Sequence, residues 1–366
     1  MILNNTHPET VALFKKLKKA AAFTDIHFGK KGNSDQHNQD CLDSITWFCE
    51  QVRKDPTIDH IVVPGDWHEL RSSLSINTMD YSLRGAELLS TLGIPIIITI
   101  GNHDLFHRDS RTMYSTIMFK HIPNIYLVPE PVVMELKHGP TLFAPFLFSD
   151  EYPGLVKHAA VPVWWGHFEF KGFVISGYNT KMEHGPEHGD FSGPKRIFSG
   201  HFHKRQIQDN IVYIGNAFPM DFSDAGDFAR GMAVYDYKHD ELEFIDWPGC
   251  PKYVKAKLSQ FLDETAAIPA NSRVRCIIDV PLTYEESIII KQTFLVQYEL
   301  RELRLEESDE LTDVLTNTET GEIMENPEGR LNTVDELVVQ MLGAIDTPKI
   351  DQAMLVNLYQ KLQSEG

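Results

Sequence analysis

The stretch IPIIITIGNHD, Ile94–Asp104, determines the expected fold, because a run of apolar residues ends directly in Gly, Asn, His and Asp. A short apolar run bounded by turn residues is typical of a buried strand. Two similar runs precede it, AAAFTD at 20–25 and HIVVPGD at 60–66, and amphipathic stretches at 41–54 and 79–93 alternate with the three runs. This alternation of strands and helices predicts an α/β domain with parallel strands.

A second pattern begins at about residue 159. Six strand-like runs follow one another up to Trp247 without a clear long helix between them: VPVWWGH, GFVIS, KRIFSGH, IVYIGN, RGMAVYDY and ELEFIDW. An alternating half followed by a strand-rich half predicts two packed mixed β-sheets with helices outside them. We therefore assign residues 1–250 to one α/β domain.

The rest of the chain has a different organisation. The runs RVRCIIDV, TYEESIIIKQTFLVQ and ELRELRLEES predict strand, helix and strand, and hence a small α+β domain at 251–312. Residues 313–331 are polar, contain Gly and Pro, and predict a linker. Residues 332–366 have apolar side chains at helical spacing and predict two short amphipathic helices, separated by Pro348.

The composition limits the class of protein. The net charge is −18, and residues 301–366, with 15 acidic and 5 basic residues, contribute −10 of it, so the acidity is concentrated beyond the α/β domain. No run of about 18 apolar residues is present, so we expect no membrane span. The cysteines form no CxxC pair and no dense framework, which indicates thiols in a reducing cytoplasm: Cys41, Cys49, Cys250 and Cys276.

Polar side chains that can bind metal ions recur where the predicted strands end. They are Asp25, His27, Asp66, Asn102, His167, His201 and His203. The carboxyl ends of parallel strands share one edge of a sheet, so these side chains can converge. The extended His-x-His at 201–203 presents both imidazoles on one side, which suits metal binding. Singly, each motif also occurs by chance in turns and on surfaces, whereas the ordered set does not.

Seven such ligands fit two divalent ions if Asp66 is shared between them. Two ions about 3.5–4 Å apart suit in-line hydrolysis of a phosphate ester, because they offset charge on the phosphate oxygens. Glycines that allow tight turns precede Asp66, Asn102, His167 and His201. The sequence therefore predicts a binuclear phosphoesterase site.

The order Asp-x-His, Gly-Asp, Gly-Asn-His-Asp, Gly-His and Gly-His-x-His resembles that of calcineurin-like metallophosphoesterases. Within this family, WGHFEFKGF and SGHFHKRQIQDNIVYIGNAF are most similar to the SbcD, or meiotic-recombination-eleven, nuclease subunits in their T-even phage form. The resemblance implies a four-layer fold and two divalent ions, manganese or alternatively magnesium. It assigns the first ion to Asp25, His27, Asp66 and His203, and the second to Asp66, Asn102, His167 and His201. It also implies that His103 acts at the scissile phosphate as acid or charge stabiliser, and that Asp104 orients it.

The same resemblance implies a DNA exonuclease and endonuclease in double-strand-break processing and recombination. Residues 251–312 would cap the DNA, and residues 332–366 would bind an SbcC-type ABC ATPase with a long coiled coil. The nuclease subunits would form a homodimer within a heterotetramer, through helices at about 73–92 and 110–121. An alternative is a phosphoesterase for small nucleotides or phosphoproteins. Phosphoprotein phosphatases usually carry Asp-Arg-Gly and Gly-Asn-His-Glu, whereas this chain has GDWHEL and GNHD. A scaffold with an inactive site is disfavoured because all seven ligands are retained.

The chain departs from the family pattern at three places. Cellular members usually have a histidine three places after the Asp of Gly-Asp, where this chain has Glu69 preceded by His68. Asn216 and Ala217 stand where the family often has Ser or Thr and Pro. Residues 1–18 precede the usual start of the family, and we interpret them as a helix, a DNA-contacting arm or an artefact of the choice of start site.

Overall fold

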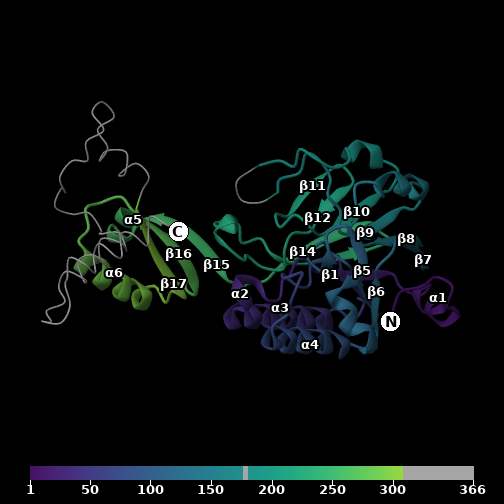
Figure 1. Ribbon diagram of the computed structural model, residues 1–366, viewed down its shortest axis with the longest axis horizontal. Coiled ribbons are helices and arrows are strands. Elements are labelled where there is room, and N and C mark those ends of the chain that lie inside the picture. The colour runs from purple at the N-terminus through teal and green to yellow at the C-terminus, as the bar shows by residue number, and fades with distance from the viewer. Residues whose placement is uncertain (176–179, 308–366) are drawn as a thin grey trace, which may run out of the picture. The chain divides into compact units, whose positions relative to one another are not determined.

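The computed structural model describes residues 1–175 and 180–307 (Figure 1). The chain divides into two compact units, Met1–Tyr253 and Val254–Gly366. None of the helices in the described ranges is both long and apolar enough to cross a membrane.

The first unit contains a six-stranded mixed sheet in the order β14-β13-β1-β2-β3-β6. Strands β1, β2, β3 and β6 run parallel, β13 is antiparallel to β1, and β14 is antiparallel to β13. The strands are β1 (Lys19–Ala22), β2 (His60–Val63), β3 (Ile96–Thr99), β6 (Ile125–Val128), β13 (Gly231–Asp236) and β14 (Glu241–Asp246). The apolar runs of the sequence thus form the parallel centre of this sheet.

A second six-stranded sheet has the order β11-β12-β10-β9-β8-β7. Strands β8, β9, β10 and β12 run parallel, and the edge strands β7 and β11 pair antiparallel with their neighbours. The strands are β7 (Val132–Leu136), β8 (Gly139–Ala144), β9 (Val163–Gly166), β10 (Arg196–Ser199), β11 (Gln206–Gln208) and β12 (Ile211–Tyr213). The predicted α/β class with two packed mixed sheets is confirmed.

The two sheets pack face to face because residues alternate between the faces of each strand. In β2, Val62 belongs to the cluster between the sheets, whereas Ile61 and Val63 belong to the cluster on the helix side. Trp165 and Phe198 of the second sheet lie in the same inter-sheet cluster. Their rings are stacked, with centroids 4.2 Å apart. This core holds the carboxyl ends of both sets of parallel strands at fixed positions.

Helices α3 (Asp35–Lys54) and α4 (Ile76–Ser90) cover the outer face of the first sheet, and Figure 1 shows them side by side. Each begins at a serine that accepts a main-chain hydrogen bond, Ser34 from His37 N and Ser75 from Thr78 N. The other short elements of this unit are α1 (Pro8–Phe14), α2 (Lys30–Asn33), η1 (Ser115–His121), η2 (Tyr152–His158), η3 (His188–Phe191), η4 (Phe222–Asp224) and the hairpin of β4 (Leu105–His107) and β5 (Ser110–Tyr114).

The outer face of the second sheet is covered differently from the first. Tyr152 of η2 and Phe191 of η3 pack with Trp164 and Ile197 in a third apolar cluster. Over the described residues, the cover therefore consists of 3₁₀ helices and loops. The segments concerned contain several Gly and Pro residues, which interrupt longer helices.

Residues 1–18 form part of the first unit. Helix α1 places Phe14 in the inter-sheet core, and Ile2 forms a parallel bridge with Leu127. The Met1 amino group donates hydrogen bonds to the carbonyl oxygens of Lys120 and Ile125. The predicted helix in this segment is confirmed, and contact of the segment with DNA stays a prediction.

The second unit has its own small core. Strands β15 (Lys252–Lys257), β16 (Ser272–Ile278) and β17 (Glu302–Glu307) form a three-stranded sheet, with α5 (Leu258–Leu262) and α6 (Tyr284–Gln297). Strands β16 and β17 are parallel and α6 connects them, as the strand–helix–strand pattern predicts. The roles assigned to 251–312, 313–331 and 332–366 stay predictions, and the last two segments lie outside the described residues.

Candidate metal centre

The seven predicted ligands lie in loops that follow parallel strands of both sheets. Asp25, Asp66 and Asn102 follow β1, β2 and β3, whereas His167 and His201 follow β9 and β10. His27 and His203 come two residues after Asp25 and His201. The side chains of all seven contact one another in two groups.

The first group consists of Asp25, His27 and His203, whose ligand atoms lie within 4.8 Å of one another. His27 Nε2 lies 3.1 Å from His203 Nε2 and 4.0 Å from Asp25 Oδ1. Asp25 and His27 are buried, and His203 is half-buried. Two imidazole nitrogens that face each other beside a carboxylate are suited to share a cation.

The second group consists of Asp66, His167 and His201, again with ligand atoms within 4.8 Å of one another. His167 Nε2 lies 3.3 Å from Asp66 Oδ2. Asn102 joins this group, because its Oδ1 lies 2.9 Å from His167 Nε2 and 3.0 Å from His201 Nδ1.

Asp66 lies between the two groups. Its Oδ2, which faces His167, is also 3.8 Å from His27 Nε2 of the first group. Its Oδ1 accepts a hydrogen bond of 2.8 Å from the main-chain N–H of His103. Asp66 is thus placed where a ligand shared by two ions has to lie.

Four of these residues have a strained backbone. Asp25, His27, Asp66 and His201 adopt φ angles of 51°, 53°, 52° and 87°, in the left-handed region. For a non-glycine residue this conformation costs about 1–3 kcal/mol, and such strain clusters at functional sites. The conformational strain at these four positions therefore indicates a functional requirement for the directions of their side chains.

Glycines provide the space that these loops need. A Cβ on Gly65 would lie 2.6 Å from His167 Nδ1, and one on Gly200 would lie 2.4 Å from Thr24 Oγ1. A Cβ on Gly101 would lie 2.1 Å from Asp66 Oδ1 and 2.2 Å from Asp66 N. Such contacts are far inside van der Waals distance, so the loops of the first and second sheets can approach only with glycine at these positions.

We expect Gly101→Ala to lower both stability and activity, because its methyl group would push Asp66 out of place. Overpacking of this kind typically costs about 1–3 kcal/mol. Urea unfolding measures the stability, and hydrolysis of bis(p-nitrophenyl) phosphate measures the activity. Gly154→Ala is the matched control, because a Cβ there meets no atom within 4 Å. Normal activity of the Gly101 variant would show that the loop geometry is not required.

The charges in this cluster oppose one another. Burial, with the nearby Asp66 carboxylate, raises the pKa of Asp25 to about 6. Burial opposes protonation of His167, but Asp66 outweighs it and raises the pKa of His167 to about 9. Carboxylate, amide and imidazole donors suit divalent first-row cations, and buried charges at this density require compensation. The residues present therefore fit two divalent cations.

His103 lies beside the first group and is partly exposed. Its ring is nearly perpendicular to that of His27, with centroids 4.9 Å apart. Its Nδ1 lies 2.9 Å from the carbonyl oxygen of Glu69, which leaves Nε2 for other contacts. Burial lowers the pKa of His103, although the Asp66 carboxylate opposes this effect.

The Asp104 carboxylate has main-chain partners, and its role in orienting His103 stays a prediction. The resemblance implies that it orients His103, but its carboxylate accepts hydrogen bonds from Gly101 N at 2.9 Å and His68 N at 3.1 Å. Among the described contacts, the His103 ring is held instead by the Glu69 carbonyl. The Asp104 side chain is buried and binds main-chain groups of its own loop and of the loop after β2, so it fixes the backbone that carries His103.

His68 and Glu69 occupy different environments. His68 is buried, with its ring nitrogens 2.8 Å from Ser115 Oγ and 2.8 Å from Ser82 Oγ, and burial lowers its pKa to about 3. Glu69 lies at the site, with Oε2 2.7 Å from His27 Nδ1. No role for Glu69 is predicted from the sequence. The one feature of the sequence that marks this position is a carboxylate in place of the histidine of the family pattern.

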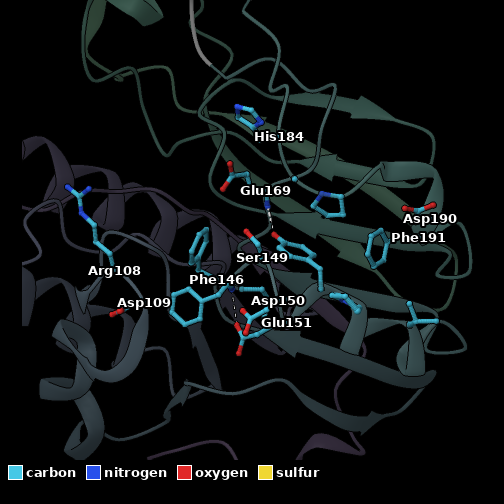
Figure 2. A pocket seen from close by; sticks show the side chains of 17 residues that line it. Arg108, Asp109, Phe146, Ser149, Asp150, Glu151, Glu169, His184, Asp190 and Phe191 are labelled. Carbon is cyan, nitrogen blue, oxygen red and sulfur yellow. Dashed lines mark hydrogen bonds between the residues drawn. The ribbon is translucent and has the colours of Figure 1, made fainter.

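A pocket of about 1160 Å³ borders the second group (Figure 2). Phe146 lines it and packs against His167 and His201, and Glu169 Oε2 lies 3.8 Å from His201 Nε2. Figure 2 shows carboxylates around the hollow, namely Asp109, Asp150, Glu151, Glu169 and Asp190. Among these carboxylates, Glu151 forms an ion pair with Arg111. Arg108 and His184 also line the pocket, so its wall carries both signs of charge with an excess of carboxylates.

Three comparisons with known proteins bear on this site. The model of the calcineurin-like phosphoesterase family matches residues 18–205, more than half of the chain, and this segment contains all seven residues. Exonuclease subunit 1 of Enterobacteria phage T4 is 25% identical over 225 residues, which are 60% of this chain and 65% of that protein. The chain thus spans slightly less than two thirds of the length of this relative. The resemblance inferred from the motifs is confirmed.

Two solved structures are also similar. One is an archaeal phosphodiesterase, with a TM-score of 0.35 and 12% identity, which covers 63% of this chain and 99% of that one. The other is a purple acid phosphatase from seeds of yellow lupin (Lupinus luteus), with a TM-score of 0.36 and 14% identity, which covers 62% of this chain and 45% of that one.

Proposed function

Because the chain belongs to the calcineurin-like phosphoesterase family, we propose that it is a DNA exonuclease and endonuclease that hydrolyses phosphodiesters with two divalent ions. The observation that carries the proposal is the shared position of Asp66. One of its oxygens faces His27 of the first group and His167 of the second group. A monoester or diester phosphate that spans the two groups would meet both ions and His103.

The ligands divide between the ions as follows. The first ion would be held by Asp25, His27, Asp66 and His203, and the second by Asp66, Asn102, His167 and His201. Manganese is the proposed metal, with magnesium as a substitute, because the family resemblance implies this preference. Carboxylate and amide oxygens suit both ions, whereas imidazole nitrogens suit transition metals. When bound, the ions supply Lewis-acid stabilisation of the charge on the phosphate oxygens.

The chain's own groups supply proton handling and orientation. The Glu69 carbonyl accepts a hydrogen bond from His103 Nδ1–H, so a second proton on this ring resides at Nε2. From there it can be donated to a phosphate oxygen or to the leaving group. The hydrogen bond from His103 N to Asp66 Oδ1 holds the backbone of His103 beside Asp66, which lies between the two groups of ligands.

Two observations support DNA as the substrate. The loops of the site carry basic residues shortly after their motifs, namely Lys30, Arg71, Arg108 and Lys204. Such side chains can contact a phosphate backbone. The similar T4 protein is an exonuclease subunit, and 60% of this chain aligns with it.

The same likeness supports a proposal about partners. We propose a nuclease subunit of an SbcCD-type complex in double-strand-break processing and recombination, with an SbcC-type ABC ATPase and a second copy of this chain. Residues 251–312 would cap the DNA. Residues 332–366 would bind the ATPase through their apolar residues.

A cleavage assay on defined DNA ends tests the proposal. We expect Mn²⁺ to support cleavage of linear DNA, EDTA to abolish it, and added Mn²⁺ to restore it. The assay is run with Mg²⁺ in parallel, and with and without the ATPase. Hydrolysis of bis(p-nitrophenyl) phosphate without DNA cleavage would indicate a small-substrate phosphodiesterase. Hydrolysis of a phosphopeptide alone would indicate a phosphatase, and either result would overturn the DNA assignment.

A further inference from the structure

Glu69 contacts the site through two different groups. Its carboxylate Oε2 lies 2.7 Å from His27 Nδ1, and its main-chain carbonyl lies 2.9 Å from His103 Nδ1. Lys30 Nζ is 3.5 Å from the other carboxylate oxygen, Oε1. The Glu69 side chain is 21% exposed, so most of it is withdrawn from solvent beside the ligands.

We infer that Glu69 is a positioning residue, whose carboxylate sets the ring of His27 toward the first ion while its carbonyl independently sets the ring of His103. The inference rests on the proposed function and deepens it. It assigns a role to a residue that departs from the family pattern, where a histidine is usual.

The geometry of His27 supports the first half of the inference. With a carboxylate at Nδ1, the neutral ring keeps its proton on Nδ1 and presents the Nε2 lone pair to His203 and Asp25. A carboxylate behind a metal-binding imidazole also makes that imidazole more basic. His27 Nδ1 and Glu69 Oε2 are buried and lie 2.7 Å apart, and within the described chain neither atom has an aligned hydrogen-bond partner. Each buried atom therefore faces the other as its nearest group of opposite character.

The loop geometry explains why Glu69 reaches His27. Glu69 N donates a hydrogen bond of 3.0 Å to the Phe28 carbonyl, and Phe28 N donates one of 2.9 Å to the Trp67 carbonyl. The segment after β2 thus runs beside the segment after β1. Phe28 is paired with His68, so Glu69 and His27 each lie next to this pair. The long side chain of Glu69 therefore reaches the ring of His27 on the neighbouring segment.

Two simpler explanations account for less. An ion pair with Lys30 at 3.5 Å involves Oε1 of Glu69, and it leaves the contact of Oε2 with His27 unexplained. A third cation between His27, Glu69 and His103 would use atoms within 4.8 Å of one another. It would, however, need Nδ1 of His103, which already faces the Glu69 carbonyl.

Titration with Mn²⁺ alone, without substrate, tests the inference. Free Mn²⁺ is measured by electron paramagnetic resonance for wild type, Glu69→Ala and Glu69→Gln. We expect Glu69→Ala to bind one of two ions about 10–100-fold more weakly and the other unchanged. Glu69→Gln keeps an acceptor oxygen and is expected to lose less. Asp221→Asn is the matched control, since Asp221 Oδ2 lies 4.0 Å from Lys30 Nζ and Asp221 is not among the described contacts of His27.

Steady-state kinetics supply a second readout. At saturating Mn²⁺, kcat of Glu69→Ala should return to within a few-fold of wild type, because the carbonyl that holds His103 remains. Wild-type affinity for both ions in Glu69→Ala would overturn the inference. Equal weakening of both ions together with a lower melting temperature would do the same, since it would indicate a purely structural role. Wild type that binds two Mn²⁺ but cleaves no DNA would overturn the proposed function and leave this titration intact.

Discussion

The Asp66→Asn variant is expected to lose at least about 10³-fold in phosphodiester hydrolysis while it keeps its fold. One Asp66 oxygen lies 3.3 Å from His167 Nε2 and 3.8 Å from His27 Nε2, so its charge serves both groups. An amide oxygen still accepts the hydrogen bond from His103 N, which preserves the loop. Both ions should therefore bind more weakly. Metal content after dialysis, together with hydrolysis of bis(p-nitrophenyl) phosphate, measures the effect.

A second aspartate provides the control for this variant. Asp59 also accepts main-chain hydrogen bonds, from Lys18 and Lys19, and it contacts His60 away from the site. Asp59→Asn should keep wild-type turnover even if it loses some stability. Wild-type turnover in Asp66→Asn would exclude a ligand shared by two ions.

The parallel strands at the centre of the first sheet could be predicted because two requirements agree. Their residues favour short strands, and the same apolar residues suit burial on both faces of the sheet. The runs before Asp25, Asp66 and Asn102 are short and apolar, and the last two are rich in Val and Ile, as is typical of central strands buried on both faces. Polar residues that follow them directly then lie at one edge of the sheet. The same reasoning placed His167 and His201 at the ends of two strands of the second sheet.

The contacts of individual side chains could not be predicted in the same way. His68 and Glu69 are neighbours in the sequence, yet one packs between Ser82 and Ser115 and the other reaches His27. The difference depends on α4 and η1, which approach from other parts of the chain. Spacing in the sequence identifies which residues follow a strand, but not which way each one turns.

Asp104 illustrates the same limit. The motif Gly-Asn-His-Asp places His103 and Asp104 side by side, which invited the assignment of one as partner of the other. Main-chain N–H groups of Gly101 and His68 instead occupy the Asp104 carboxylate. Adjacent residues in a loop point in different directions, so a main-chain carbonyl from another loop became the partner of His103.

The His103→Ala variant is expected to keep both ions and to lose about 10²–10⁴-fold in turnover, the range typical of a group that transfers a proton in the transition state. The main-chain N–H that binds Asp66 is unaffected by this change, so the ligand between the two groups stays in place. The substitution removes the imidazole ring of His103. The side chain is 35% exposed, so the ring is accessible to a substrate. Single-turnover hydrolysis and bound Mn²⁺ per chain are measured on the same sample.

His107→Ala is the matched control for this experiment, because His107 lies exposed on β4, a few residues along the same loop. It should retain both turnover and metal. The ring of His103 also lies against that of His27, in a cluster with Glu69 whose atoms could hold a cation themselves. If His103→Ala loses Mn²⁺ in proportion to its activity, His103 is a ligand and not the acid. If it keeps Mn²⁺ and full turnover, the proton comes from another group.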